Sequence, residues 1–120
     1  MLFKNPESGE SHQHVAGFVT PEGGLLSGDG VKSVTRTNTG EYRIEFAAPF
    51  AAPPAVVATL HNPTKDLSVH AVITYGITTT YVDILTGDAD APYPDAKYPD
   101  RVGAPKDSAF CFIAFGNAAA

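Results

Sequence analysis

The sequence has no tryptophan, one cysteine and few basic residues. A single cysteine cannot form an internal disulfide, and Cys111 lies in an apolar run, so we expect it to be a small buried side chain. Lys and Arg number 8 against 13 Asp and Glu, which gives a formal net charge of −5. This balance argues against a nucleic-acid groove and against binding to an anionic membrane surface.

Long apolar runs are also missing. No segment approaches the roughly twenty apolar residues of a transmembrane helix, so no membrane insertion is expected. The first ten residues, MLFKNPESGE, do not contain the apolar core of a signal peptide. We therefore expect synthesis in the cytoplasm, with a virion or extracellular location only after release. A length of 120 residues fits one domain.

Short segments of alternating apolar and polar residues are abundant. Between residues 42 and 46, Tyr, Ile and Phe alternate with Arg and Glu, which is typical of a half-buried β-strand. The preceding residues 38–40, NTG, predict a hairpin turn with Gly40 at positive φ, and residues 31–37 predict its other strand. Prolines between residues 49 and 54 end the second strand, and Phe50 is expected to anchor this bend to the core.

Similar short segments recur along the chain, and turn residues separate them. The pattern predicts an all-β fold, an antiparallel β-sandwich of about six or seven strands with no significant helix. Segments 55–60 and 110–115 are almost wholly apolar, so both are expected to be covered on two faces, the second by the other sheet or by a neighbouring chain. We expect a flexible N-terminal arm over 1–14, a single sandwich domain over 15–117 and a frayed tail over 118–120.

Residues 86–109 have no clear strand pattern and are rich in Asp, Pro and Tyr. A loop of this length in a compact domain is usually functional or disordered. Flat aromatic rings together with carboxylates and Arg suit sugar hydroxyls, which predicts a ligand-binding loop. The alternative is that the same loop packs at an interface between chains. The candidate ligand-binding residues are Asp88, Asp90, Tyr93, Asp95, Tyr98, Asp100 and Arg101.

The histidines are the other candidates for chemistry. His12 and His14 would share one face of an extended chain, but two ligands complete a metal site only if they are shared across a threefold axis. His61 and His70 could act as bases only with a positioned partner, and none is evident in the sequence. No catalytic motif is present, so neither a catalytic residue nor a cofactor is predicted.

The segment GVKSVTRTNTGEYRIEFAAPFAAPPAVVAT resembles a small β-domain at the ends of bacteriophage tail-fibre and bacterial surface proteins. The register also resembles the H-type lectins, through an Ile-x-Phe-x-x-Pro-Phe segment, Pro-Pro-x-Val-Val, the alternation of Leu67, Val69 and Ala71, and the aromatic-rich strand 110–115. The resemblance covers roughly residues 25–116. It implies an antiparallel sandwich that forms a homotrimer and, in the lectins, binds sugar through loops at one end. The lectins' Trp-His region and disulfide have no counterpart, so the resemblance implies fold and trimer but not sugar-contacting residues.

Three functions follow as hypotheses. The first is a non-enzymatic binding module, the carbohydrate- or receptor-binding domain of a trimeric phage-like fibre or bacterial surface protein. Its partners would be two further copies of the chain and a glycan or cell-surface receptor. The second is a purely structural homotrimerisation domain. The third is a small enzyme, a cyclase or isomerase, with a pocket between the sheets.

Overall fold

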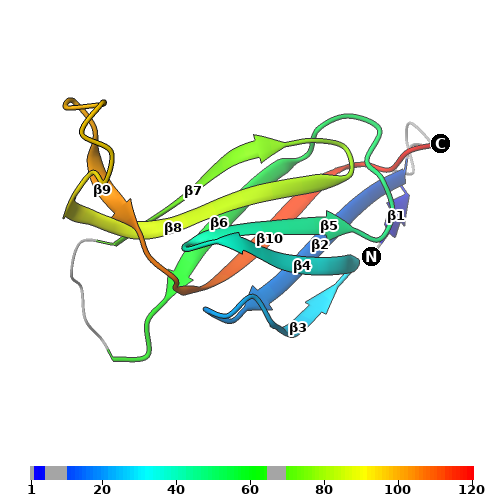
Figure 1. The fold of residues 1–120 in the computed structure, drawn as a ribbon. Coiled ribbons are helices and arrows are strands. Elements are labelled where there is room, and N and C mark those ends of the chain that lie inside the picture. Colours follow the sequence, from blue (N-terminus) through cyan, green and yellow to red (C-terminus); the bar gives the residue numbers. More distant parts are fainter. Residues whose placement is uncertain (1, 5–10, 65–69) are drawn as a thin grey trace.

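The computed structural model describes residues 2–4, 11–64 and 70–120. These residues form ten β-strands and no helix, arranged as two five-stranded antiparallel sheets that pack face to face (Figure 1). The predicted antiparallel β-sandwich is thereby confirmed. The strand number exceeds six or seven because short strands pair at the edges and because part of the expected loop 86–109 is itself paired.

The first sheet, which we call sheet A, has the order β1-β2-β10-β6. Its strands are β1 (Leu2–Lys4), β2 (Ser11–Val19), β6 (Ala55–His61) and β10 (Ala109–Asn117), and β3 (Leu25–Asp29) also pairs with β2. Strand β2 begins at Ser11, so the last four residues of the expected arm lie in the sheet. Residues 5–10 of that arm lie outside the described residues. In the expected tail, the Ala118 N–H donates to the Ser11 carbonyl at 2.8 Å.

The second sheet, sheet B, has the order β4-β5-β8-β7. Its strands are β4 (Val31–Asn38), β5 (Glu41–Phe46), β7 (His70–Ile77) and β8 (Tyr81–Pro92), and β9 (Val102–Pro105) pairs with β8. Strands β4 and β5 form the predicted hairpin, with Gly40 at a φ of 70°. The expectation that 86–109 is a loop throughout is wrong. Strand β8 continues to Pro92 and β9 returns beside it, so the segment forms a hairpin that projects from the body (Figure 1).

The core lies between the sheets and consists of the inward positions of both. Tyr42 of β5 and Phe110 of β10 are fully buried, and their rings meet across the core at 5.1 Å with an interplanar angle of 62°. Phe50 is 2% exposed and packs edge-on against Phe46 at 5.1 Å, which confirms its predicted role as the anchor of the proline-rich bend. Other buried apolar side chains include Val15, Val19, Ile44, Val82, Ile84, Phe112 and Ala114.

Strand β10 lies between β2 and β6, as its apolar sequence predicts. Only one of its faces is buried, because none of the residues that the structure describes forms a third layer over the outside of sheet A. Ile113 is 54% exposed and Phe115 is 45% exposed on the outward side. The expectation that residues 55–60 are covered on both faces is wrong for the single chain, since β6 is an edge strand and Val57 is 73% exposed.

Candidate functional site

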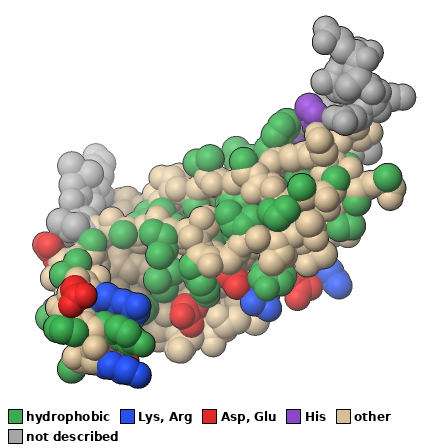
Figure 2. Space-filling model, turned by 90° about the horizontal axis from the view of Figure 1, so that it is seen from above, with side chains coloured by type: hydrophobic (Ala, Val, Ile, Leu, Met, Phe, Trp, Pro, Cys, Tyr) green, Lys and Arg blue, Asp and Glu red, His purple; other side chains and the backbone are tan. Residues whose placement is uncertain are grey.

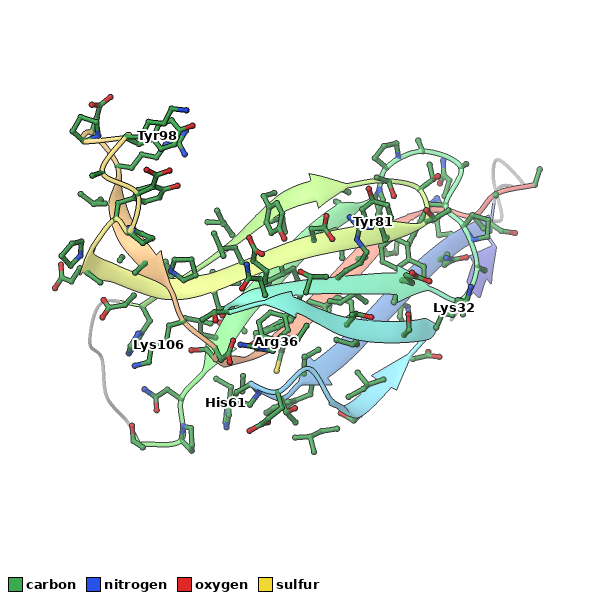
Figure 3. The ribbon with its side chains drawn as sticks, viewed as in Figure 1. Lys32, Arg36, His61, Tyr81, Tyr98 and Lys106 are labelled. Carbon is green, nitrogen blue, oxygen red and sulfur yellow. The ribbon has the colours of Figure 1, made fainter. Side chains whose placement is uncertain are left out.

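Three of the predicted ligand residues meet at the end of the β8–β9 hairpin. The rings of Tyr93 and Tyr98 lie edge to face, with centroids 6.1 Å apart. The guanidinium of Arg101 lies 3.9 Å from the centre of the Tyr98 ring, and its Nη1 donates to the Tyr93 hydroxyl at 3.1 Å. We call these three residues the tip cluster. Figure 3 shows Tyr98 at the outer end of the hairpin, and β1 and the end of β10 lie at the other end of the domain (Figure 1).

The aspartates of this segment differ in their hydrogen bonds and exposure. Asp88 Oδ1 accepts the Asp90 backbone N–H, and Asp95 Oδ1 accepts the Lys97 backbone N–H, both at 3.0 Å. These side-chain contacts to the backbone two residues on stabilise local turns. Asp90 and Asp100 are exposed. These contacts of Asp88 and Asp95 are therefore to the backbone, and a role of Asp90, Asp95 and Asp100 in ligand binding stays a prediction.

A groove lies where the hairpin leaves sheet B, with a cavity volume of about 320 Å³. Its apolar lining includes Ile73 and Leu85, which face each other across β7 and β8, and Val102, which is 81% exposed. We call it the hairpin groove. The tip cluster joins it through Tyr93, and the carboxylate-bearing residues Glu41 and Asp88 line it as well. The arrangement offers an aromatic ring, an apolar floor and hydrogen-bond acceptors to one small ligand.

The sequence analysis did not predict four members of this groove, which are Glu41, Ile73, Leu85 and Val102. The available signal is the alternation in β8, which predicts that Tyr81, Asp83 and Leu85 share the outward face. In the structure Asp83 accepts two hydrogen bonds from Arg43, at 2.8 and 3.0 Å, and the Arg43 guanidinium lies 3.9 Å from the centre of the Tyr81 ring. The hydrogen bonds from Arg43 to Asp83 raise the pKa of Arg43.

A second cavity, of about 730 Å³, lies at the end of the sandwich where β6, β7 and the β9–β10 connection meet. It brings together His61, His70, Lys106 and Asp107, and Figure 3 shows His61 and Lys106 there. Within the described parts of the chain, Nδ1 of His70 is buried without a hydrogen-bond partner. The enzyme hypothesis requires a pocket between the sheets with a buried His or Asp, and this cavity at the end of the sandwich is the candidate for it.

The Asp107 carboxylate in this cavity already accepts hydrogen bonds from other parts of the chain. Asp107 accepts hydrogen bonds from the Arg36 side chain and from the Gly40 backbone N–H, which lower its pKa. The Tyr42 hydroxyl also lies 3.4 Å from its Oδ1. A carboxylate held in this way is a poor proton acceptor for a neighbouring histidine. Its geometry is that of a structural tie between β4 and the β9–β10 connection.

No group of three metal-ligating side chains occurs among residues 11–64 and 70–120. His12 and His14 do share one face, as predicted, because they alternate with the buried Gln13 and Val15 in β2. The Nε2 of His14 lies 3.7 Å from a carboxylate oxygen of Asp29. Whether a threefold axis completes a metal site around the two histidines stays a prediction.

A third candidate surface is the outer face of sheet A. Strands β2, β6 and β10 contain no Asp, Glu, Lys or Arg, although 18% of the chain is charged. In the view from above, the charged side chains of the domain lie along one long side and at one end (Figure 2). We define the outer face of sheet A by its outward positions, which are His12, His14, Ala16, Phe18, Ala55, Val57, Thr59, His61, Cys111, Ile113 and Phe115.

Comparison with known proteins yields no relative: no family model, no curated protein and no solved structure matches this chain. The resemblance to tail-fibre domains and H-type lectins is therefore based on the sequence pattern alone. Among the residues that the structure describes, no helix is long and apolar enough to cross a membrane.

Proposed function

We propose that this domain is a non-enzymatic binding module that recognises a carbohydrate or a glycan-bearing receptor through the hairpin groove and the tip cluster. The observation that carries the proposal is that Tyr93 belongs to both: it lines the groove, and its hydroxyl accepts the hydrogen bond from Arg101. A sugar ring has an apolar face that stacks on an aromatic ring and hydroxyls that donate to carboxylates. The groove offers Tyr93 for the first contact and the residues Glu41 and Asp88 for the second.

A binding screen tests this proposal directly. Saturable binding to an immobilised glycan or a cell-wall extract is expected, and Tyr93→Ala should weaken it by about tenfold through loss of the stacked ring. Tyr93→Phe keeps the ring and should retain most of the affinity. Lys32→Ala is the matched surface control, because Lys32 lies far from the hairpin (Figure 3). Binding that is unaffected by Tyr93→Ala, or no binding at millimolar glycan, would rule out the groove as a sugar site.

Self-association is a second proposed function, and a separate observation favours it. The outer face of sheet A combines exposed apolar side chains with three strands that contain no Asp, Glu, Lys or Arg. An exposed apolar face of this kind usually marks an interface. The occupant we propose is the same face of further copies of the chain, as a homotrimer. Sheet B, in contrast, carries the Arg43–Asp83 and Lys32–Glu45 ion pairs on its outward side, which suits contact with water.

Light scattering measures this association. The wild-type chain is expected to have the mass of three copies, and Ile113→Glu should reduce it to one because a carboxylate cannot be buried unpaired in an apolar interface. Val102→Glu is the matched control, since it places the same charge on a more exposed residue of the hairpin. A monomeric wild-type chain would contradict the proposal, as would an Ile113→Glu variant that keeps the wild-type mass.

A further inference from the structure

The outward side of sheet B continues from the hairpin groove toward the start of β8. Strand pairing places Glu41 opposite Leu85, and Leu85 opposite Ile73 of β7, and all three residues line the groove. Arg43 and Asp83 form the next pair on the same side of the sheet, because each is two residues further along its strand. The groove and the Arg43–Asp83 ion pair therefore share one face.

Two tyrosines extend this face beyond the groove. Tyr81 is two positions before Asp83 in β8, and the Arg43 guanidinium lies 3.9 Å from the centre of the Tyr81 ring. Tyr75 of β7 is 49% exposed. Burial raises the pKa of the Tyr75 hydroxyl, and the carboxylates of Asp83 and Glu41 raise it further, so this hydroxyl lies near both carboxylates. We call Arg43, Tyr75, Tyr81 and Asp83 the sheet B patch.

The sheet B patch and the hairpin groove form one elongated surface. Tyr81 begins β8 and Leu85 is four residues further on, which is about 13 Å at the usual rise of a strand. Figure 3 shows Tyr81 at one end of β8 and Tyr98 beyond its other end. Val82 and Ile84 between them are fully buried, so the outward side chains are carried by a strand that is fixed in the core. This surface is longer than a single sugar ring.

The chemistry of the patch suits several sugar units in a row. Aromatic rings stack on the apolar face of a sugar, while a guanidinium donates to sugar hydroxyls and a carboxylate accepts from them. Two hydrogen bonds to Asp83 orient the Arg43 guanidinium, and the Arg43 side chain is still 42% exposed. The ion pair carries no net charge, and the carboxylates of Glu41 and Asp88 in the groove disfavour acidic sugars. The surface therefore favours a neutral chain.

We propose that the ligand is a linear, neutral oligosaccharide that occupies the hairpin groove and the sheet B patch together, rather than a single terminal sugar. The inference rests on the glycan binding proposed above and names the class of glycan. Tyr93 contacts the ligand in the groove, and Tyr75 and Tyr81 contact units further along the chain. Affinity therefore increases with the length of the oligosaccharide until the ligand covers the patch.

Calorimetric titration of the full chain with oligosaccharides of increasing length tests the proposal. The probes are the disaccharide and the hexasaccharide of neutral gluco-, manno-, xylo- and N-acetylated chito-oligosaccharides. In the series that binds, the hexasaccharide should bind at least about tenfold more tightly than the disaccharide. Tyr75→Ala should remove most of this gain and leave disaccharide affinity unchanged, whereas Tyr93→Ala should weaken both ligands.

Leu26→Ala is the matched control, because Leu26 is a large exposed side chain on sheet A, at 68% exposure, and both affinities should stay at the wild-type value. Circular dichroism checks that each variant is folded. Tyr75→Phe keeps the ring and should keep most of the gain with length.

The outcomes separate this inference from the proposed function. Equal affinity for the two lengths, with binding still weakened by Tyr93→Ala, would overturn the role of the sheet B patch and leave glycan binding in the groove standing. A Tyr75→Ala variant with the wild-type gain would do the same. Tighter binding of a hexasaccharide of galacturonic acid would overturn the assignment of a neutral ligand. The absence of binding by every series at millimolar concentration would overturn both proposals.

Discussion

The Nε of Arg36 donates to both carboxylate oxygens of Asp107, each at 3.0 Å, although the two residues are 71 positions apart. The Gly40 backbone N–H donates to the same carboxylate at 2.7 Å. This ion pair ties the β4–β5 hairpin of sheet B to the connection that leads into β10 of sheet A. Asp107 follows the end of β9 at Pro105, so the ion pair anchors the chain where it leaves the β8–β9 hairpin.

Replacing Asp107 tests this tie. Both side chains are about one third exposed, so solvent screens the pair, and Asp107→Asn should lower the free energy of unfolding by only about 1 kcal/mol at pH 7. Glu45→Gln is the matched control, because its partner Lys32 is 3.8 Å away and 69% exposed, and its cost should be within about 0.5 kcal/mol. Urea unfolding measures both. An equal cost for the two variants would contradict the tie.

The pH dependence of this contribution has a defined sign. Hydrogen bonds from Arg36 and then Gly40 lower the pKa of Asp107 in the folded state. The stabilisation is thus fully present above the unfolded value of about 3.9 and is lost as pH falls through the lower folded value. Stability of the wild-type chain should decline below about pH 4, and Asp107→Asn should decline less steeply. Parallel curves for the two proteins would contradict this assignment.

Gly40 is predicted to be intolerant of any side chain. Its φ of 70° is in the left-handed region, and an added Cβ would collide with the Thr86 carbonyl oxygen. Gly40→Ala should therefore cost at least about 2 kcal/mol of unfolding free energy. Gly24→Ala is the comparison, since its nearest neighbour is the Thr20 hydroxyl at 3.1 Å and its φ is not in that region. Thermal unfolding measures both variants. An equal loss of stability in the two variants would contradict the turn geometry.

Two phenylalanines on opposite faces of β10 should have separable effects. Phe110 is fully buried, so Phe110→Ala should lower the free energy of unfolding by about 3–5 kcal/mol. Phe115 is 45% exposed on the outer face, so Phe115→Ala should weaken assembly more than folding of the single chain. Denaturation and sedimentation of both variants distinguish the effects. Equal loss of folding stability in a monomeric background would contradict the assignment of the two faces.

The tip cluster is expected to order the hairpin locally. Arg101→Ala removes the contact with the Tyr98 ring and the hydrogen bond to Tyr93, but it leaves the core unchanged. Cleavage after Lys97 by a lysine-specific protease should become faster, because proteolysis tracks local opening. The free energy of global unfolding should change by no more than about 0.5 kcal/mol, which is the range of a surface substitution. Unchanged cleavage would show that the cluster does not order the tip.

The strand pattern predicted most of the body of the fold, because alternation in residues 42–46 and 81–85 follows directly from which face is buried. The hairpin was missed because Asp, Gly and Pro in residues 86–109 have loop propensities, and only pairing between β8 and β9 makes these residues strands. The aromatic and Arg content identified Tyr93, Tyr98 and Arg101. Glu41 and Ile73 could not be found in this way, because sheet pairing brings them to the groove from distant parts of the sequence.

Cys111 provides the most direct measurement of the central claim, that further copies of this chain cover the outer face of sheet A. Its thiol is on that face, opposite Phe18 and Thr59 of the flanking strands. The account predicts that a maleimide reacts with Cys111 more slowly in the wild-type chain than in the Ile113→Glu variant, while Val102→Glu reacts at the wild-type rate. A carboxylate near the thiol would itself slow the reaction, so acceleration in Ile113→Glu reports exposure. Equal rates in all three proteins would contradict the claim.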